Sequence, residues 1–253
     1  MIDVHAPAGR FREALAELPL SARPADRVNG AVVVVPGHAG WVDAALAAVS
    51  AGAIALVIAD PAAVPAADLR RLAGTRIPII IERVLLRADV SADAVAARTA
   101  ALGGVPPRVL VADVAASRAW LSAATRDAVG WLRILAGDAL TTVAADDGMA
   151  LLETSGGISA TLTAVVMTRH DAGRIRVQAL GEVITDVEVE GRTAGLVTTS
   201  PAGRLIAPSR FESSERLALR RAVEALAAQT APTDLADLLA DTELVERIQR
   251  SAR

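Results

Sequence analysis

Two short apolar runs flank a stretch with helical periodicity between residues 28 and 61. Residues 31–35 and 54–59 are almost wholly apolar, as expected for strands that are buried on both faces of a parallel sheet. One helical face follows Gly40, with apolar residues at the spacing i, i+3, i+4 and i+7: Val42, Ala45, Leu46 and Val49. Two buried strands joined by one helix must be parallel, with a right-handed crossover. The pattern therefore predicts a βαβ unit.

Apolar periodicity continues on both sides of this unit. A strand over residues 2–5 and a helix over 9–18 precede it, followed by a Pro-rich connection over 19–24. A helix over 66–73 and a strand over 77–81 follow it, and Pro78 favours an edge position for that strand. Further elements are expected over 91–101 (helix), 109–114 (strand) and the residues before Gly137 (helix, capped by Ser117 or Ser122).

The pattern changes after Gly137. Residues 139–199 contain strand-like runs separated by turn signals, including one at His170 and Asp171, which predicts a mostly antiparallel sheet. A capping box at Ser209 and Glu212 and an apolar pattern after Thr233 predict two closing helices. We therefore expect an α/β domain over residues 1–120, with a shortened Rossmann-like parallel sheet. An α+β domain with an open-faced sheet is expected over 121–253, and its last helices are free to pack back on the first domain.

The chain lacks several residue types on which common mechanisms depend. It has no cysteine, no lysine and no tyrosine, and all 26 basic residues are arginine. This excludes disulfides, thiolate catalysis, thiolate metal sites and Schiff-base chemistry, because arginine stays protonated in proteins. The glycine fingerprint G-x-G-x-x-G is also missing after the first strand, where Gly9 stands alone.

Charge and hydropathy exclude further classes of protein. The formal net charge is −3 and only 2% of residues are aromatic, so no nucleic-acid footprint is present. No apolar run is long enough to span a bilayer, and no signal peptide is visible at the N-terminus. No His, Asp and Glu spacing is typical of a metal site. A cytoplasmic protein is expected.

The order of these elements, with several motifs, resembles the glucose–fructose oxidoreductase / inositol dehydrogenase (Gfo/Idh/MocA) family. Residues 32–61 are similar to the family's fourth strand, its Thr-Pro-Asn-type loop and the following strand, which ends in Glu-Lys-Pro in the family. Residues 124–138 are similar to the helix that carries a His-x-x-Asp pair, and residues 239–253 to the C-terminal helix. The resemblance implies a two-domain NAD(P)-dependent oxidoreductase fold.

The catalytic positions of the family are replaced here. Asp60 occupies the lysine position of Glu-Lys-Pro, and Asp127 and Gly130 occupy the His-x-x-Asp positions. Gly37, after Pro36, stands where the loop has its asparagine. General acid–base catalysis needs a group whose pKa lies near the operating pH, which an ordinary aspartate does not provide. The resemblance thus implies a degenerate member, with no catalytic residue and no cofactor expected.

Candidate ligand residues follow the carboxyl ends of the predicted strands or lie on the His-x-x-Asp-like helix: Pro36, Gly37, His38, Asp60, Arg83, Arg126 and Asp127. Asp60 and Asp127 are expected to face each other across a cleft. Three functions remain open: a non-catalytic oligomeric or partner subunit, an NAD(P)-dependent oxidoreductase acting on a sugar or cyclitol, and a polyol- or sugar-binding module.

The predicted second sheet has a candidate interface. In the family that it resembles, the open face of this sheet packs against another subunit. We expect six residues on that face: Thr161, Thr163, Val165, Val177, Val187 and Val189. This predicts a homo-oligomer, or a hetero-oligomer with an active paralogue.

Overall fold

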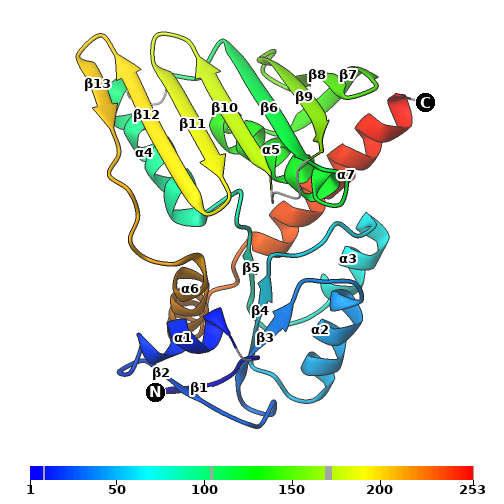
Figure 1. The fold of residues 1–253 in the computed structure, drawn as a ribbon, viewed down its shortest axis with the longest axis vertical. Helices are drawn as coiled ribbons and strands as arrows, with labels where there is room; N and C mark the ends of the chain where they lie inside the picture. The colour runs from blue at the N-terminus through cyan, green and yellow to red at the C-terminus, as the bar shows by residue number, and fades with distance from the viewer. Residues whose placement is uncertain (8, 103–104, 169–172, 253) are drawn as a thin grey trace. The chain divides into compact units, whose positions relative to one another are not determined.

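The computed structural model describes residues 1–7, 9–102, 105–168 and 173–252, and the chain divides into two compact units (Figure 1). Unit 1 comprises Met1–Arg83 and Phe211–Leu239, and unit 2 comprises Val84–Arg210 and Ala240–Arg253. The turn expected at His170 and Asp171 lies outside the described residues. Both fold classes expected from the sequence are present, one in each unit.

Unit 1 contains a five-stranded sheet in the order β2-β1-β3-β4-β5, and every pair in it is parallel. Its strands are β1 (Ile2–His5), β2 (Ala22–Pro24), β3 (Val32–Pro36), β4 (Ala55–Ala59) and β5 (Ile79–Glu82). β2 lies in the segment that the sequence pattern assigned to a Pro-rich connection. A three-residue strand that ends in proline carries too short a period to be recognised.

Helices cover both faces of this sheet. α1 (Arg10–Ala16) and α6 (Ser214–Ala228) supply one core cluster with β1, β3 and β4. α2 (Trp41–Ser50), α3 (Ala66–Leu72) and the first turns of α7 (Asp234–Ser251) supply the cluster on the other face. Because both faces are covered, β3 and β4 are apolar at nearly every position.

A side chain covers part of the exposed edge of β5. β5 is the last strand of the sheet, as Pro78 led us to expect. The Ile81 amide donates a hydrogen bond to Asp234 Oδ2 at 2.9 Å. Arg221 binds the same carboxylate with both terminal nitrogens, at 2.9 and 2.6 Å. This ion pair therefore satisfies an edge amide that would otherwise be open to another strand.

Unit 2 contains an eight-stranded sheet in the order β13-β12-β11-β10-β6-β9-β8-β7. Only the pair of β6 and β9 is parallel among these strands. The strands are β6 (Val109–Ser117), β7 (Leu140–Asp146), β8 (Met149–Thr154), β9 (Ser159–Met167), β10 (Arg174–Leu180), β11 (Ile184–Glu190), β12 (Thr193–Ser200) and β13 (Gly203–Ile206). α4 (Ala88–Leu102), α5 (Leu121–Ala136) and the end of α7 pack on one face.

The boundary expected between residues 120 and 121 differs from the division into units. β6 was assigned to the first domain, but it pairs with β9 and β10 in the second sheet. Its apolar run reads like that of a parallel strand because β6 is central and has one parallel neighbour. The chain enters unit 2 at Val84 and returns to unit 1 at Phe211, so α6 belongs to unit 1.

Three of the six residues expected on the open face of the second sheet lie there, and three do not. Thr161 and Val165 of β9 are exposed and Thr163 is half-buried, on the face away from the helices. In contrast, Val177 and Val187 are buried in the helix-covered core, as is Val189. β10 and β11 pair in a register that turns their valines inwards, and the open face carries their charged residues instead.

The helix ends differ from two expected caps. α6 begins one turn later than the capping box at Ser209 suggested: Ser213 is its N-cap, and its Oγ accepts from the Arg216 amide at 3.2 Å. α5 has Trp120 at its N-cap, without a side-chain capping bond, rather than Ser117 or Ser122. Gly137 ends α5 in the left-handed region (φ 69°), as its position predicted.

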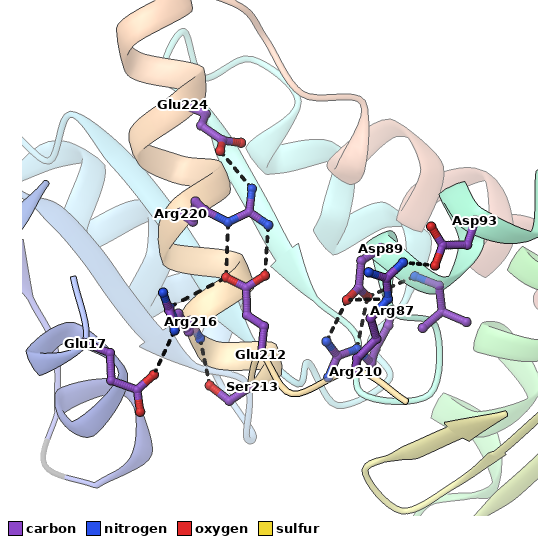
Figure 2. Close-up of polar contacts among 11 residues, drawn as sticks. Glu17, Arg87, Asp89, Asp93, Arg210, Glu212, Ser213, Arg216, Arg220 and Glu224 are labelled. Atoms are coloured by element: carbon purple, nitrogen blue, oxygen red, sulfur yellow. Dashed lines mark hydrogen bonds and ion pairs between the residues drawn. The ribbon is translucent and has the colours of Figure 1, made fainter. Parts of the chain in front are cut away.

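Ion pairs fix the chain on either side of the crossing at Phe211 (Figure 2). In unit 2, Arg210 pairs with Asp93 and lies 3.9 Å from Asp89. Burial opposes ionisation of Asp89, but bonds from Arg87 and the Val90 amide, with the charges of Arg87 and Arg210, lower its pKa overall.

On the other side of this crossing, in unit 1, Glu212 pairs with Arg220 at 2.9 Å and with Arg216 at 3.8 Å. Phe211 itself, the first residue of unit 1 after this crossing, is fully exposed. Among the described helices, none is both long and apolar enough to cross a membrane.

Candidate functional site

The order of the strands in unit 1 determines where a ligand would bind. β2 and β3 pair on opposite sides of β1, so the chain passes outwards from β1 to β2 and then crosses back over β1 to β3. In open α/β sheets this switch point, at the carboxyl ends of the strands, is where ligands bind. The loops that follow β1 and β3, with the ends of β4 and β5, therefore form the candidate site.

Gly37 fixes the loop after β3. Its amide donates to the Ala59 carbonyl at 2.8 Å, and its own carbonyl accepts from the Ala62 amide at 2.6 Å. A Cβ atom at Gly37 would lie 2.4 Å from the Ala59 oxygen and 2.5 Å from the Pro61 Cα. Only glycine fits this close approach of two backbone segments.

Trp41 reinforces the same contact from α2. Its ring is 1% exposed, and its Nε1 donates to the Ala62 carbonyl at 3.2 Å. Gly40, with φ 81°, precedes it as the N-cap of α2. The loops after β3 and β4 are thus joined through both backbone and side-chain bonds.

Asp60 adopts a strained backbone conformation at the end of β4. Its φ is +46°, which is unusual for a residue with a side chain, and its amide donates to the Glu82 carbonyl at 2.9 Å. Strain of this kind persists only where surrounding bonds hold it, and it concentrates at ligand sites. The residue at the family's lysine position is therefore held rigidly at the carboxyl edge.

His38 lies in the same loop and is exposed. Its carbonyl accepts from the Trp41 amide at 3.1 Å, while its imidazole makes no hydrogen bond to any described residue. The ring nitrogens are therefore available to hydrogen-bond a ligand at this edge.

Glu82 is the last residue of β5 and Arg83 follows it; they are 5% and 7% exposed. The sequence pattern placed Arg83 among residues that could bind an acidic ligand, and its burial separates it from ordinary solvated arginines. Pro36, Gly37, His38, Asp60 and Arg83 all belong to unit 1.

The other two candidates lie in unit 2. Arg126 and Asp127 are 3% and 2% exposed on α5. Arg126 Nε and Nη2 donate to Asp127 Oδ1 at 3.2 and 3.1 Å, so the carboxylate is engaged in an ion pair with its neighbour. Asp60 and Asp127 belong to different units, and neither unit brings together the expected carboxylate pair.

The sequence pattern missed the residues that follow β2. Asp26 and Arg27 lie two and three positions after Pro24, the last residue of β2, and both are exposed. In dinucleotide-binding folds, an acid here binds the ribose hydroxyls, and an arginine accommodates a 2′-phosphate. Only recognition of β2 as a strand would have exposed them as candidates.

The first strand is followed by Gly9, which has φ 103° and precedes α1. Arg12 stands three residues later, where the fingerprint would have its last glycine. Among the described residues, no three His, Asp or Glu side chains are grouped so as to bind a metal ion.

Comparisons with known proteins place this geometry in context. No protein-family model matches the chain, and no curated protein matches its sequence. Solved structures do match. UDP-N-acetylglucosamine 3-dehydrogenase GnnA from Acidithiobacillus ferrooxidans is 15% identical with a TM-score of 0.70, over 98% of this chain and 96% of that one.

KijD10, a 3-ketoreductase from Actinomadura kijaniata solved in complex with NADP, is 15% identical with a TM-score of 0.66. The match covers 100% of this chain and 89% of KijD10, which was also solved with TDP-benzene and NADP. The expectation that no cofactor is bound finds no support in these neighbours. The chain has the two-domain fold of these proteins, a parallel Rossmann-like sheet with a mostly antiparallel second sheet.

Proposed function

We propose that this chain is a member of the Gfo/Idh/MocA family that binds NAD(P) at the carboxyl edge of the unit 1 sheet. The observation that carries the proposal is the retained switch point at β1, with β2 and β3 on its two sides. The first βαβ unit (β1, α1 and β2) and this switch point are both present, which supports a dinucleotide site at this edge.

Individual residues at this edge suit the parts of a dinucleotide. Gly37 holds the loop after β3 close to β4. Gly9, the N-cap of α1 after β1, has no side chain that could obstruct a ligand. Asp26 and Arg27 follow β2, where the adenosine ribose is recognised. A nicotinamide, when bound, would supply the acceptor or donor of a hydride. GnnA is a UDP-N-acetylglucosamine 3-dehydrogenase, which makes a nucleotide-linked sugar the first substrate to test.

We propose further that the chain has lost competent acid–base catalysis and serves as a non-catalytic subunit. Asp60 replaces the lysine, Asp127 is ion-paired with Arg126, and the sequence holds neither lysine nor tyrosine. The second candidate is an active sugar oxidoreductase that uses His38 as its proton carrier. The exposed imidazole, without a hydrogen bond to the described residues, favours this candidate. A polyol- or sugar-binding module is the third.

One experiment separates these functions. Energy transfer from tryptophan to bound NADH or NADPH is measured as the dinucleotide is titrated, because Trp41 adjoins the candidate loop, and Gly9→Leu is the variant that blocks the site without adding a fluorophore. Saturable transfer that Gly9→Leu abolishes is expected, and a ligand at about 100 times its Kd should stabilise the protein by roughly 2.7 kcal/mol. No transfer at millimolar dinucleotide would overturn the proposal and leave the sugar-binding module.

Turnover is measured separately at 340 nm, with UDP-N-acetylglucosamine and NAD⁺ or NADP⁺. Binding without turnover is the result expected of a non-catalytic subunit. Turnover that His38→Asn removes, while NADH binding persists, would instead establish the second candidate.

We also propose that the chain assembles through the open face of the unit 2 sheet. This face carries exposed apolar residues on one side, at Met149, Leu151 and Val165. Beside them, Arg174 pairs with Glu188, and Arg176 with Asp186, in a field of alternating charge. Such a mixed surface suits a second copy, whose charges repeat in the opposite order across a two-fold axis.

A further inference from the structure

Unit 2 contains a cavity of about 600 Å³ that is separate from every residue of the candidate site. Its walls come from the first turns of α5, the turn between β7 and β8, the strand β9 and the last turns of α7. The volume lies within the range of small-molecule sites, about 300–1,000 Å³. All of its lining residues belong to unit 2.

The floor of the cavity is apolar. Leu162 of β9 and Val245 and Ile248 of α7 are 3%, 5% and 8% exposed. At the rim, Val166 is 47% exposed, although its side chain is large and apolar. An apolar group of four to seven carbons in this space would cover the rim and remain against the floor.

Two opposite charges line the same cavity without pairing. Arg118, just before α5, has no ion pair or hydrogen bond with the described residues, and neither has the carboxylate of Asp147. Asp146 is different, because its Oδ1 accepts from the Asp147 amide at 2.7 Å to hold the turn. One cation and one anion are thus available to a ligand.

The two charges lie on different walls. Arg118 stands beside Leu121 and Ser122, the first residues of α5, whose N-cap makes no side-chain bond. The amides of this first turn add to the positive potential there. Asp147 belongs to the turn between β7 and β8.

From these features we propose that this cavity binds a zwitterionic amino acid with a large apolar side chain. Arg118 and the start of α5 receive the carboxylate, Asp147 receives the ammonium group, and the side chain packs on Leu162 and Ile248. A fatty acid anion would place either its negative charge or its apolar chain against Asp147. An alkyl amine would place either its positive charge or its apolar chain against Arg118. The zwitterion satisfies both groups at once.

The test is calorimetric titration of the full chain with three probes: L-phenylalanine, 3-phenylpropanoate and 2-phenylethylamine. The last two each lack one charge of the first. We expect L-phenylalanine to bind about tenfold or more tightly than either, which corresponds to about 1.4 kcal/mol. Arg118→Gln should reduce its affinity to that of the amine, and Asp147→Asn to that of the acid.

Matched controls lie outside the cavity. Arg204→Gln and Asp113→Asn remove an exposed charge of each sign from other strands of unit 2 and should leave the affinity unchanged. The proposal is overturned if L-phenylalanine does not bind at 10 mM (about 2.7 kcal/mol weaker than a 0.1 mM Kd). The proposal is also overturned if neither Arg118→Gln nor Asp147→Asn changes the affinity for L-phenylalanine, or if the three probes bind with equal affinity.

Discussion

At the scale of single residues, Gly37 is the position where the candidate site depends on the absence of a side chain. Its amide and carbonyl bind the segment from Ala59 to Ala62, and an added Cβ would meet three backbone atoms within 2.6 Å. Backbone atoms cannot move aside as the end of a flexible side chain can. The loop after β3 and the end of β4 must therefore separate if any other residue is introduced.

We predict that Gly37→Ala lowers the free energy of unfolding by about 2–4 kcal/mol. Urea denaturation measures the change. Gly74→Ala is the matched control, since a Cβ there meets nothing within 4 Å and its φ is not positive; it should change stability by less than about 0.5 kcal/mol. Equal effects of the two substitutions would contradict this account of the loop.

The sequence pattern identified some residues of this site and not others. It found four of them because the apolar run of a buried parallel strand shows where the strand ends: Pro36, Gly37, His38 and Asp60. Arg126 and Asp127 were placed beside them through a resemblance, and whether they meet Asp60 depends on how segments distant in sequence fold together. The positive φ of Asp60 could not be predicted from the sequence, because it depends on the hydrogen bond from its amide to the Glu82 carbonyl.

At the scale of elements, the hydrophobic periodicity identified helices and strands better than it identified which strands pair with one another. β3, α2 and β4 were predicted within a residue or two, since each has a clear period and defined ends. β6 was recognised as a strand but assigned to the wrong sheet, because its pairing with β9 and β10 involves residues 50 or more positions away. β10 and β11 were placed on the wrong face for a related reason: a shift of one residue in register exchanges the faces.

The Asp234–Arg221 ion pair joins three elements, since it connects α7, α6 and the edge of β5. We predict a coupling energy of about 1–3 kcal/mol in a double-mutant cycle of Asp234→Ala and Arg221→Met, because the Asp234 side chain is only 11% exposed. Thermal or urea unfolding of the four proteins gives this value.

The control cycle uses Glu224 and Arg220, an i,i+4 pair on α6 with side chains 58% and 42% exposed. Its coupling should stay below about 0.5 kcal/mol. A coupling for Asp234 and Arg221 as small as that of the control would mean that the β5 edge needs no protection from this pair.

At the scale of the whole molecule, the open face of the second sheet makes assembly testable. We predict a dimer in light scattering at micromolar concentration, and a monomer for Val165→Asp, since a charge in the middle of an apolar contact is not paired. Val95→Asp, on the exposed side of α4, is the control and should stay dimeric. A monomeric native protein, or a dimer that tolerates Val165→Asp, would exclude this face as the interface.

The three crossings of the chain between the units also determine the order in which a ribosome could complete them. Unit 1 receives Ala218, Leu219 and Ala222 from α6 for its core, and unit 2 receives Leu244, Val245 and Ile248 from α7. A nascent chain that has been synthesised only as far as β13 therefore exposes an uncovered apolar face in each unit. Both units need segments that follow β13, so a premature stop after β13 would damage both units rather than delete one.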